Sequence, residues 1–131
     1  MRVSRGLYAT IRSRILLRYG RDVTDVDVQP RVIRNDERQR YEIWVGDDLA
    51  GFSAYQEAVE GSEEWTVFTH TEIDSAFSGR GLGSRLIQDA LDDVVRRGRV
   101  IVPICPFVRR QLRKTSAYDQ YVRRPSGSTH E

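Results

Sequence analysis

Three glycines at alternate positions, Gly79, Gly81 and Gly83, are the feature that most constrains the fold of this chain. They lie between a run rich in β-branched and aromatic residues, WTVFTHTEID, and a segment with helical periodicity. Glycine is costly inside regular structure, so the cluster indicates a turn where the backbone comes close to something else. A strand, a glycine-rich turn and a helix amino terminus together form an anion site, because unpaired N–H groups and the helix dipole point outward. The sequence therefore predicts that this turn binds a phosphate or pyrophosphate, with Arg80 and Arg85 adding positive charge, and the alternative is a purely structural turn.

The spacing of the glycines excludes two common nucleotide-binding motifs. No Gly-Lys-Ser/Thr follows, as a P-loop requires. The dinucleotide fingerprint also fits poorly, because the glycines alternate and no βαβ unit precedes them.

The segment after the glycines is predicted to be an amphipathic helix that stops at Gly98. Asp89, Asp92 and Asp93 fall on its polar face, where Asp92 can pair with Arg96 one turn on. The apolar face consists of Leu86, Ile87, Ala90, Leu91, Val94 and Val95.

The preceding segments read as three antiparallel strands joined by short turns. RQRYEIWV alternates apolar and polar residues, GDD is a turn, and LAGFSAYQEA is the return strand of a hairpin. EGSEE is a second turn before WTVFTHTEID. After the helix, RVIVPICPF is a short apolar strand and VRRQLRK a second helix. The pattern predicts a mixed α/β fold.

Composition bounds the protein class. A chain of 131 residues with 39% hydrophobic residues suits one domain, and no run of about 18 apolar residues could span a membrane. The single cysteine, Cys105, cannot form an internal disulfide, which fits a reducing compartment, and we expect a cytoplasmic protein. No metal site is visible, because the second histidine, His130, lies in the polar tail.

The charge is divided unevenly along the chain. Residues 1–21 hold six arginines and no acid, residues 22–95 have a net charge of −11, and residues 96–131 have a net charge of +7. A nucleic-acid binder would not carry so acidic a middle, so we expect no nucleic-acid partner. The pattern suits a protein that binds a phosphorylated ligand in one place and a cationic partner in another.

Residues 1–30 are expected to be an extension outside the domain. Their arginines and apolar residues fit an amphipathic helix, a loosely attached segment or an organelle presequence. We expect the domain itself to cover residues 31–124, followed by a disordered tail at 125–131.

Several ordered motifs then resemble one family. FSGRGLGSRLIQDAL resembles the acetyl-CoA pyrophosphate loop of the GNAT superfamily of N-acetyltransferases, with Gly81 and Gly83 at its two small positions and Ser78 where Gln or Arg is usual. AGFSAY, FTHTEID, VPICPF and SAYDQYV are similar to motifs of a compact, single-domain branch of that superfamily. Ser116-Ala117-Tyr118 stands where that branch has Pro-Glu-Tyr.

The resemblance implies an antiparallel meander followed by a β-α-β-α unit, with acetyl-CoA in a cleft where two parallel strands splay apart. The pantetheine would pair with the backbone around residues 71–73, the pyrophosphate would lie on residues 79–84, and the 3′-phosphate would reach Arg109, Arg110 or Arg113. The implied cofactor-binding residues are Thr71, Ile73, Gly79, Arg80, Gly81, Leu82, Gly83, Ser84, Pro106, Phe107 and Arg110.

Four side chains are candidates for the chemistry of acetyl transfer to an amine. His70 and Glu72 are two apart on a strand, share a face, and can take the ammonium proton. Cys105 is either a buried small residue or a nucleophile that forms an acetyl-thiol intermediate. Tyr118 could protonate the departing CoA thiolate or simply pack in the closing segment.

The sequence is thus best interpreted as an acetyl-CoA-dependent N-acetyltransferase that acts on a primary amine, such as a protein lysine drawn to the acidic middle of the chain. Two alternatives remain at this point. One is a CoA-binding module of the same fold without catalysis, which the departures at Ser78 and Ser116–Tyr118 would favour. The other is a nucleic-acid binder that uses the basic ends.

Overall fold

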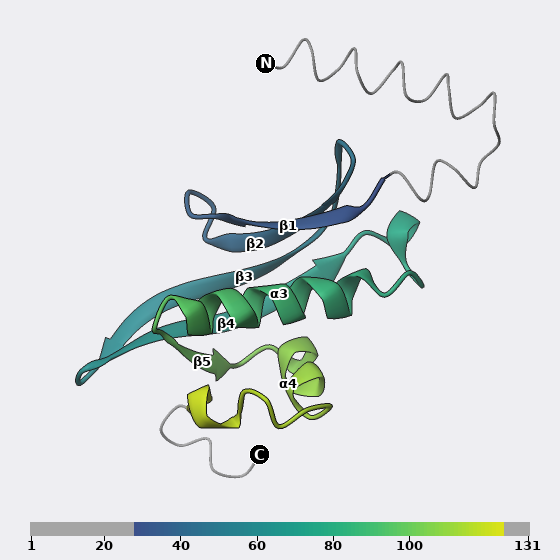
Figure 1. Ribbon diagram of the computed structural model, residues 1–131. Helices are drawn as coiled ribbons and strands as arrows, with labels where there is room; N and C mark the ends of the chain where they lie inside the picture. Colours follow the sequence, from purple (N-terminus) through teal and green to yellow (C-terminus); the bar gives the residue numbers. More distant parts are fainter. Residues whose placement is uncertain (1–27, 125–131) are drawn as a thin grey trace, which may run out of the picture.

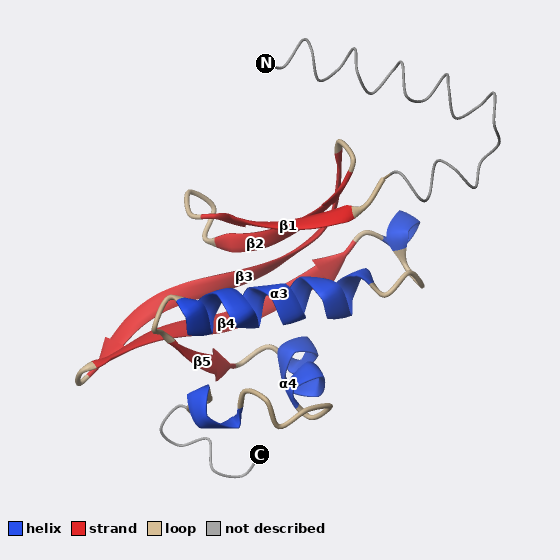
Figure 2. Ribbon diagram, viewed as in Figure 1, coloured by secondary structure: helices blue, strands red, loops and turns tan. Residues whose placement is uncertain are grey.

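The computed structural model describes residues 28–124, and these form a five-stranded sheet with helices on one side (Figure 1). The strand order is β1-β2-β3-β4-β5, with the first four antiparallel and β5 parallel to β4. The strands are β1 Pro30–Asn35, β2 Arg40–Val45, β3 Asp48–Glu60, β4 Glu63–Ile73 and β5 Val100–Pro103. Helix α3, Leu82–Arg96, connects β4 to β5 and lies across one face of the sheet, and α4, Pro106–Leu112, follows β5 (Figure 2).

The expected meander is confirmed, and the sheet begins earlier than the sequence pattern indicated. Gly46 and Gly61, both with positive φ, form the turns after β2 and β3. The additional strand β1 pairs with β2 across a short connection at residues 36–39. The N-terminal segment and the tail lie outside the described residues, so the expectations for them stay predictions. Within residues 28–124, no helix is both long and apolar enough to cross a bilayer.

Strand β4 contains one extra residue, Thr69. Tyr55 of β3 pairs with Phe68, yet the preceding Ala54 pairs with His70, so Thr69 has no partner across the ladder. Such a bulge interrupts the alternation of side chains along a strand. Phe68 is therefore buried in the core, whereas His70, two positions later, is exposed on the opposite face.

The parallel pairing of β4 and β5 stops at the same place. The last paired residues are Phe68 and Pro103, and the amides of Ile104 and Cys105 both donate to the Phe68 carbonyl oxygen. The chain then turns away into α4. Beyond Phe68, the β5 side of β4 has no strand beside it within the described residues.

Backbone groups on this open side belong to Thr71 and Ile73. The Asp74 amide donates to the Ala50 carbonyl of β3, and the Glu72 carbonyl oxygen lies against Gly51 of the same strand. Because successive peptide groups of a strand point to alternate sides, the N–H and C=O groups of residues 71 and 73 face the opening.

The amphipathic helix is confirmed as α3. It ends as expected, with Gly98 in the left-handed region, φ 76°, and its amide bonded to the Val95 carbonyl. Burial of each large apolar side chain stabilises the fold by about 1.5–3 kcal/mol. The buried residues of α3 are Leu82, Leu86, Ile87, Ala90, Leu91 and Val94.

One expectation about the polar face of α3 is wrong. Arg96 pairs with Asp93, at 2.9 Å, rather than with Asp92. Asp93 also does not face outward: it accepts a hydrogen bond from the buried Tyr41 hydroxyl, at 2.7 Å. Asp92 instead accepts a hydrogen bond from Tyr118.

Helix α4 packs across the first turn of α3. The Ser84 hydroxyl donates to Gln111 Oε1, at 3.1 Å, and the ring of Phe107 covers Gly83. A Cβ placed on Gly83 would lie 2.4 Å from Phe107 Cζ. Gly83 is thus required for contact between the two helices, a role that its place in the glycine cluster did not suggest.

We predict that Gly83→Ala destabilises the protein, although alanine in an open helix would be favoured over glycine by about 0.5–1 kcal/mol. The Phe107 ring must move to admit the methyl group, which costs roughly 1–3 kcal/mol. In a Phe107→Leu background the same substitution should become neutral or stabilising. Urea unfolding of the four proteins measures this coupling, and an unchanged effect of Gly83→Ala in both backgrounds would contradict the packing argument.

Candidate functional site

The glycine-rich turn leads directly into an uncapped helix. After a 3-10 turn at Ser75–Phe77, Gly79 and Gly81 adopt φ values of 76° and 74°. Gly81 is the N-cap of α3, and no side chain caps the helix. A Cβ on Gly79 or Gly81 would meet no atom within 4 Å, so the turn is open to its surroundings. The amides of the first helical turn, which have no intrahelical acceptors, are therefore available to an anion.

The two arginines next to the turn differ in their environment. The Arg80 guanidinium lies over the ring of Phe77, 5.5 Å from its centroid, and remains at the turn. Arg85 forms an ion pair with Asp89, at 2.9 Å, and donates to the Pro30 carbonyl. Of the two, Arg80 is the cation that can serve a ligand on the turn.

Arg109 and Arg110 lie in α4, and Arg113 is its C-terminal cap. The three side chains project from different faces of this helix. Phe107 and Gln111 mark the face that contacts α3. Arg110 stacks on Phe107, with its guanidinium 5.3 Å from the ring centroid. Arg109 and Arg113 are four apart and project from the roughly opposite face, where they line a separate cavity. Arg110 is thus the one of the three beside the glycine turn.

His70 and Glu72 form a pair on the exposed face of β4. His70 Nε2 lies 2.7 Å from Glu72 Oε2, and the side chains are 59% and 61% exposed. The predicted shared face is confirmed by this contact. The bulge at Thr69 directs both side chains away from the core, toward solvent and any acceptor.

An aromatic ring and a buried ion pair lie beside this pair, and sequence reasoning missed them. Phe52 of β3 is adjacent to His70, with ring centroids 6.2 Å apart. The Arg40 guanidinium lies over the Phe52 ring, at 4.6 Å, and its Nε donates to Glu42 Oε2, at 2.8 Å. The register places Glu42, Phe52 and Glu72 in one row across three strands.

Glu42 is only 3% exposed, and its charge is held by three donors. Burial opposes ionisation, but hydrogen bonds from Arg40, Trp44 and Asn35 outweigh it and hold the pKa of the Glu42 carboxyl below its usual value. A carboxylate between two apolar residues of a strand was the available signal in the sequence, because a charge in that place has to be paired.

Cys105 lies on the other side of β4 from His70. It is 3% exposed and N-caps α4, and its thiol donates to Thr71 Oγ1, at 3.4 Å. Thr71 Oγ1 also lies 2.8 Å from Ser53 Oγ, which is fully buried. The structure therefore places Cys105 beside the opening of the two strands, but does not bring it into contact with His70.

Tyr118 is not brought together with the other three candidates. Its hydroxyl donates to Asp92 Oδ1, which lies about 15 Å along the helix axis from the start of α3. Burial and the hydrogen bond to Asp92 raise the pKa of Tyr118 to about 12. In this position the tyrosine connects the closing segment to α3.

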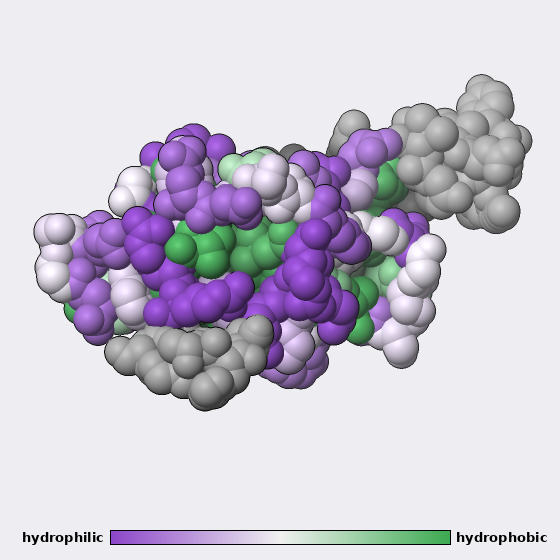
Figure 3. All heavy atoms as spheres, turned by 90° about the horizontal axis from the view of Figure 1, so that it is seen from below, coloured by the Kyte–Doolittle hydropathy of each residue, from purple (hydrophilic) through white to green (hydrophobic). Residues whose placement is uncertain are grey.

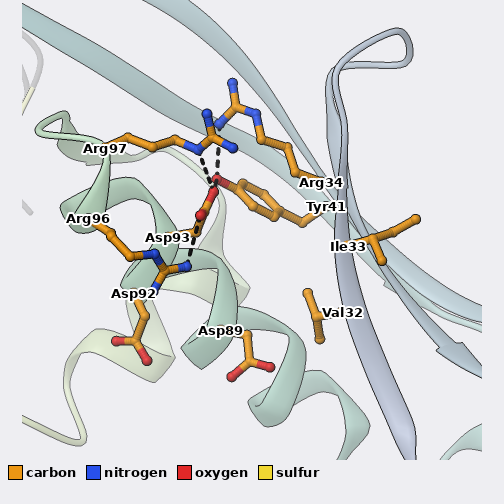
Figure 4. A pocket seen from close by; sticks show the side chains of 9 residues that line it. All are labelled: Val32, Ile33, Arg34, Tyr41, Asp89, Asp92, Asp93, Arg96 and Arg97. Carbon is orange, nitrogen blue, oxygen red and sulfur yellow. Dashed lines mark hydrogen bonds and ion pairs between the residues drawn. The ribbon is translucent and has the colours of Figure 1, made fainter.

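A cavity of about 460 Å³ between β1, β2 and α3 contains none of the expected site residues (Figure 4). In this cavity the Tyr41 hydroxyl donates to Asp93 and accepts from Arg34 Nη1, at 3.0 Å. Asp93 also accepts hydrogen bonds from Arg96 and Arg97. Burial and the hydrogen bond to Asp93 raise the pKa of Tyr41. Asp93 pairs with Arg96 and Arg97 of the same cavity. Arg34 and Asp89 pair with charged residues that lie outside its lining, which favours a structural role for the cavity.

No group of three or more His, Cys, Asp or Glu residues in the range 28–124 could hold a metal ion. The expected chemistry requires none. The groups that converge at the splayed end of the sheet are thus backbone amides, the His70–Glu72 pair and the Cys105 thiol.

Comparison with known proteins agrees with this geometry. The model of a family described as GCN5-related N-acetyl-transferase matches residues 40–122. The fold is similar to that of a ribosomal-protein-alanine N-acetyltransferase from Brucella melitensis biovar Abortus 2308, at 22% identity and a TM-score of 0.50, with 69% of this chain and 64% of that chain covered. This chain therefore spans less than two thirds of the Brucella protein.

A GCN5-like protein from Staphylococcus aureus is similar at 18% identity and a TM-score of 0.51, over 77% of this chain and 95% of that one. No curated protein sequence matches this chain. The two structural likenesses confirm the mixed α/β fold that the sequence predicted.

We predict that Glu42→Gln destabilises the protein by about 3–5 kcal/mol at neutral pH, because Arg40 loses its buried partner. Because the pKa of Glu42 is lowered in the folded protein, the ionised carboxylate contributes to the free energy of unfolding above the unfolded carboxyl pKa of about 4.3. This contribution is lost as the pH falls below that value. The difference between variant and wild type should therefore narrow at acidic pH. Urea unfolding at several pH values tests this, with the exposed Glu37→Gln as control. A difference independent of pH would contradict it.

Proposed function

Since this chain belongs to the GCN5-related N-acetyltransferase family, we propose that it transfers an acetyl group from acetyl-CoA to a primary amine. The observation that carries the proposal is the meeting of two features at one end of the sheet. The uncapped amino terminus of α3 and the open edge of β4 lie where β4 and β5 diverge. An elongated ligand with a pyrophosphate and an amide-containing arm fits such a junction.

In this proposal the pyrophosphate binds the amides of residues 79–84, where the helix dipole favours negative charge. The two amides of the pantetheine arm pair with the free N–H and C=O groups of Thr71 and Ile73, as an added strand would. Arg80 and Arg110 supply charge for the phosphates. Pro106, which has no N–H, and Phe107 border the cleft on the α4 side.

The reaction needs a neutral amine, and the His70–Glu72 pair can provide it. Either side chain can take the proton of the acceptor ammonium directly or through water. The amine nitrogen then attacks the thioester carbonyl carbon, the C–S bond breaks, and the CoA thiolate takes up a proton. Direct attack is favoured over an acetyl-cysteine intermediate, because Cys105 is buried and its thiol is directed to Thr71 rather than to a base.

The acceptor side is open in a way that suits an amine on a long side chain. Only residues 36–39 connect β1 to β2, and the His70–Glu72 pair is more than half exposed. We infer that a lysine side chain of a protein, or a linear polyamine, is the acceptor. The Brucella protein is named for ribosomal-protein alanine, so a peptide with an N-terminal alanine is the natural competing acceptor.

Binding of acetyl-CoA is the first test. We predict that Gly81→Glu abolishes it, because a carboxylate enters the anion site, as observed by calorimetric titration. Gly61→Glu is the matched control: it has the same positive φ and open surroundings but lies in the turn between β3 and β4. Equal binding by both variants would show that the turn holds no phosphate, and the proposal would fail.

Turnover is the second test. His70→Gln should lower the rate of acetyl transfer about a hundredfold or more, if His70 is the base. Glu60→Gln, an exposed carboxylate at the far end of β3, should have no effect. Thiol release with a lysine peptide, spermidine and an alanine peptide measures the rate. Binding of acetyl-CoA without turnover on any amine would favour a non-catalytic CoA-binding module.

Cys105→Ala and Tyr118→Phe separate the remaining roles. If transfer is direct, Cys105→Ala should keep a substantial rate and no acetylated enzyme should accumulate in the wild type, as measured by mass spectrometry.

Tyr118→Phe should reduce stability by about 1 kcal/mol, through the lost hydrogen bond, with little change in rate. A large loss of rate without a loss of stability would place the tyrosine in the reaction after all.

A further inference from the structure

A cavity with a basic rim lies between α4 and the segment that closes the domain. Its volume is about 740 Å³, within the range of small-molecule sites. The segment after α4 returns along β5, where Val122 bridges Ile101 and the Arg123 amide donates to the Ile101 carbonyl. The cavity is therefore bordered by a helix on one side and by this added edge on the other.

The cavity combines an apolar floor with a cationic rim. Pro103, Leu112 and Val122 supply apolar surface. The face on which β5, α4 and the closing segment lie is shown in Figure 3, where hydrophobic side chains gather in the middle and hydrophilic ones surround them. The basic side chains of the rim are Arg109, Arg113, Lys114 and Arg124.

Two of the four cations of the rim are not neutralised by side chains of residues 28–124. Asp119 is the one carboxylate among the described lining residues. Arg113 and Arg124 are exposed, and no side chain in the range 28–124 pairs with either guanidinium. The hydroxyls of Thr115 and Ser116 add neutral donors. This contrasts with Arg34, Arg40 and Arg99, each of which has a carboxylate partner.

The cavity is distinct from the proposed acetyl-CoA site. Arg109 and Arg113 project from the face of α4 opposite to Phe107 and Gln111, which contact the first turn of α3. A ligand of the glycine turn would thus lie on one side of α4 and a ligand of the cavity on the other.

We propose that this cavity binds a small phosphorylated ligand with an apolar or ring-shaped portion, of the size of a nucleoside polyphosphate. Guanidinium groups bind phosphate oxygens in forked pairs, and several cations around one opening favour more than one negative charge. Leu112 and Val122 would contact the uncharged portion. The inference does not depend on acetyl transfer, because it concerns the opposite face of α4.

The test is calorimetric titration of the full chain with ATP, tripolyphosphate and AMP at constant ionic strength, with saturating acetyl-CoA present. If acetyl-CoA does not bind, the titrations are made with the Gly81→Glu protein instead, because the new carboxylate keeps phosphate from the glycine turn. We expect ATP to bind more tightly than AMP, and tripolyphosphate to bind less tightly than ATP because it lacks the apolar portion.

Arg113→Glu combined with Arg124→Glu should weaken ATP binding at least tenfold. The matched control reverses Arg31 and Arg38, two exposed arginines on β1 and the turn after it, at the opposite edge of the sheet from β5, and should leave binding unchanged. If the reversed protein does not fold, Arg113→Gln with Arg124→Gln should give a smaller loss in the same direction.

Three outcomes would overturn the proposal. They are the absence of binding by ATP and tripolyphosphate, equal weakening in the cavity variant and its control, and salt-dependent binding of single-stranded RNA in place of ATP. The last result would assign the basic rim to nucleic acid instead.

Discussion

The bulge at Thr69 in β4 determines which way the side chains and backbone groups of residues 70–73 face. If Thr69 were paired as in a regular strand, residues 66, 68, 70 and 72 would share one face, and His70 and Glu72 would point into the core beside Phe68. Because Thr69 bulges instead, the pair is directed to the surface while Thr71 is directed inward to Cys105 and Ser53. The same shift brings the backbone groups of residues 71 and 73 to the side that β5 has left. One inserted residue thus separates the proposed binding side of acetyl-CoA from the proposed side of the amine acceptor.

The glycines show why one cluster can serve more than one purpose. Gly79 and Gly81 are needed for their positive φ and have open surroundings, which fits a turn that receives a ligand. Gly83 has ordinary helical φ but is covered by Phe107. It therefore joins the two helices whose first turns border the proposed pyrophosphate site. We therefore expect ligand binding and helix packing to be coupled through this contact, since a displaced Phe107 would also move its neighbour Arg110.

The sequence predicted what depends on local pattern. Local contacts produce the 3.6-residue period of α3, the glycine at its end and the hairpin turns. A short stretch of sequence is therefore enough to predict each of them. The shared face of His70 and Glu72 follows from their spacing alone. Which face they share depends on the bulge, and nothing in FTHTEID distinguishes a regular strand from a bulged one. Glu42 and Asp93 have local partners, but each also has a partner from another strand, Asn35 for Glu42 and Tyr41 for Asp93. Asp92 accepts from Tyr118 of the closing segment. These long-range contacts could not be deduced from a single segment.

The acidic middle of the chain illustrates the same limit for charge. A net charge of −11 over residues 22–95 suggested an acidic surface that attracts a cationic acceptor. In the folded protein many of these carboxylates pair with arginines, several of them brought from distant segments. Among residues 28–124, the carboxylates that pair include Asp36, Glu42, Glu57, Glu63, Glu64, Asp89 and Asp93. We therefore expect the attraction of an amine acceptor to depend less on the total charge of the segment than on the exposed Glu72 beside His70, because an acceptor responds to the charge within a Debye length of its binding site.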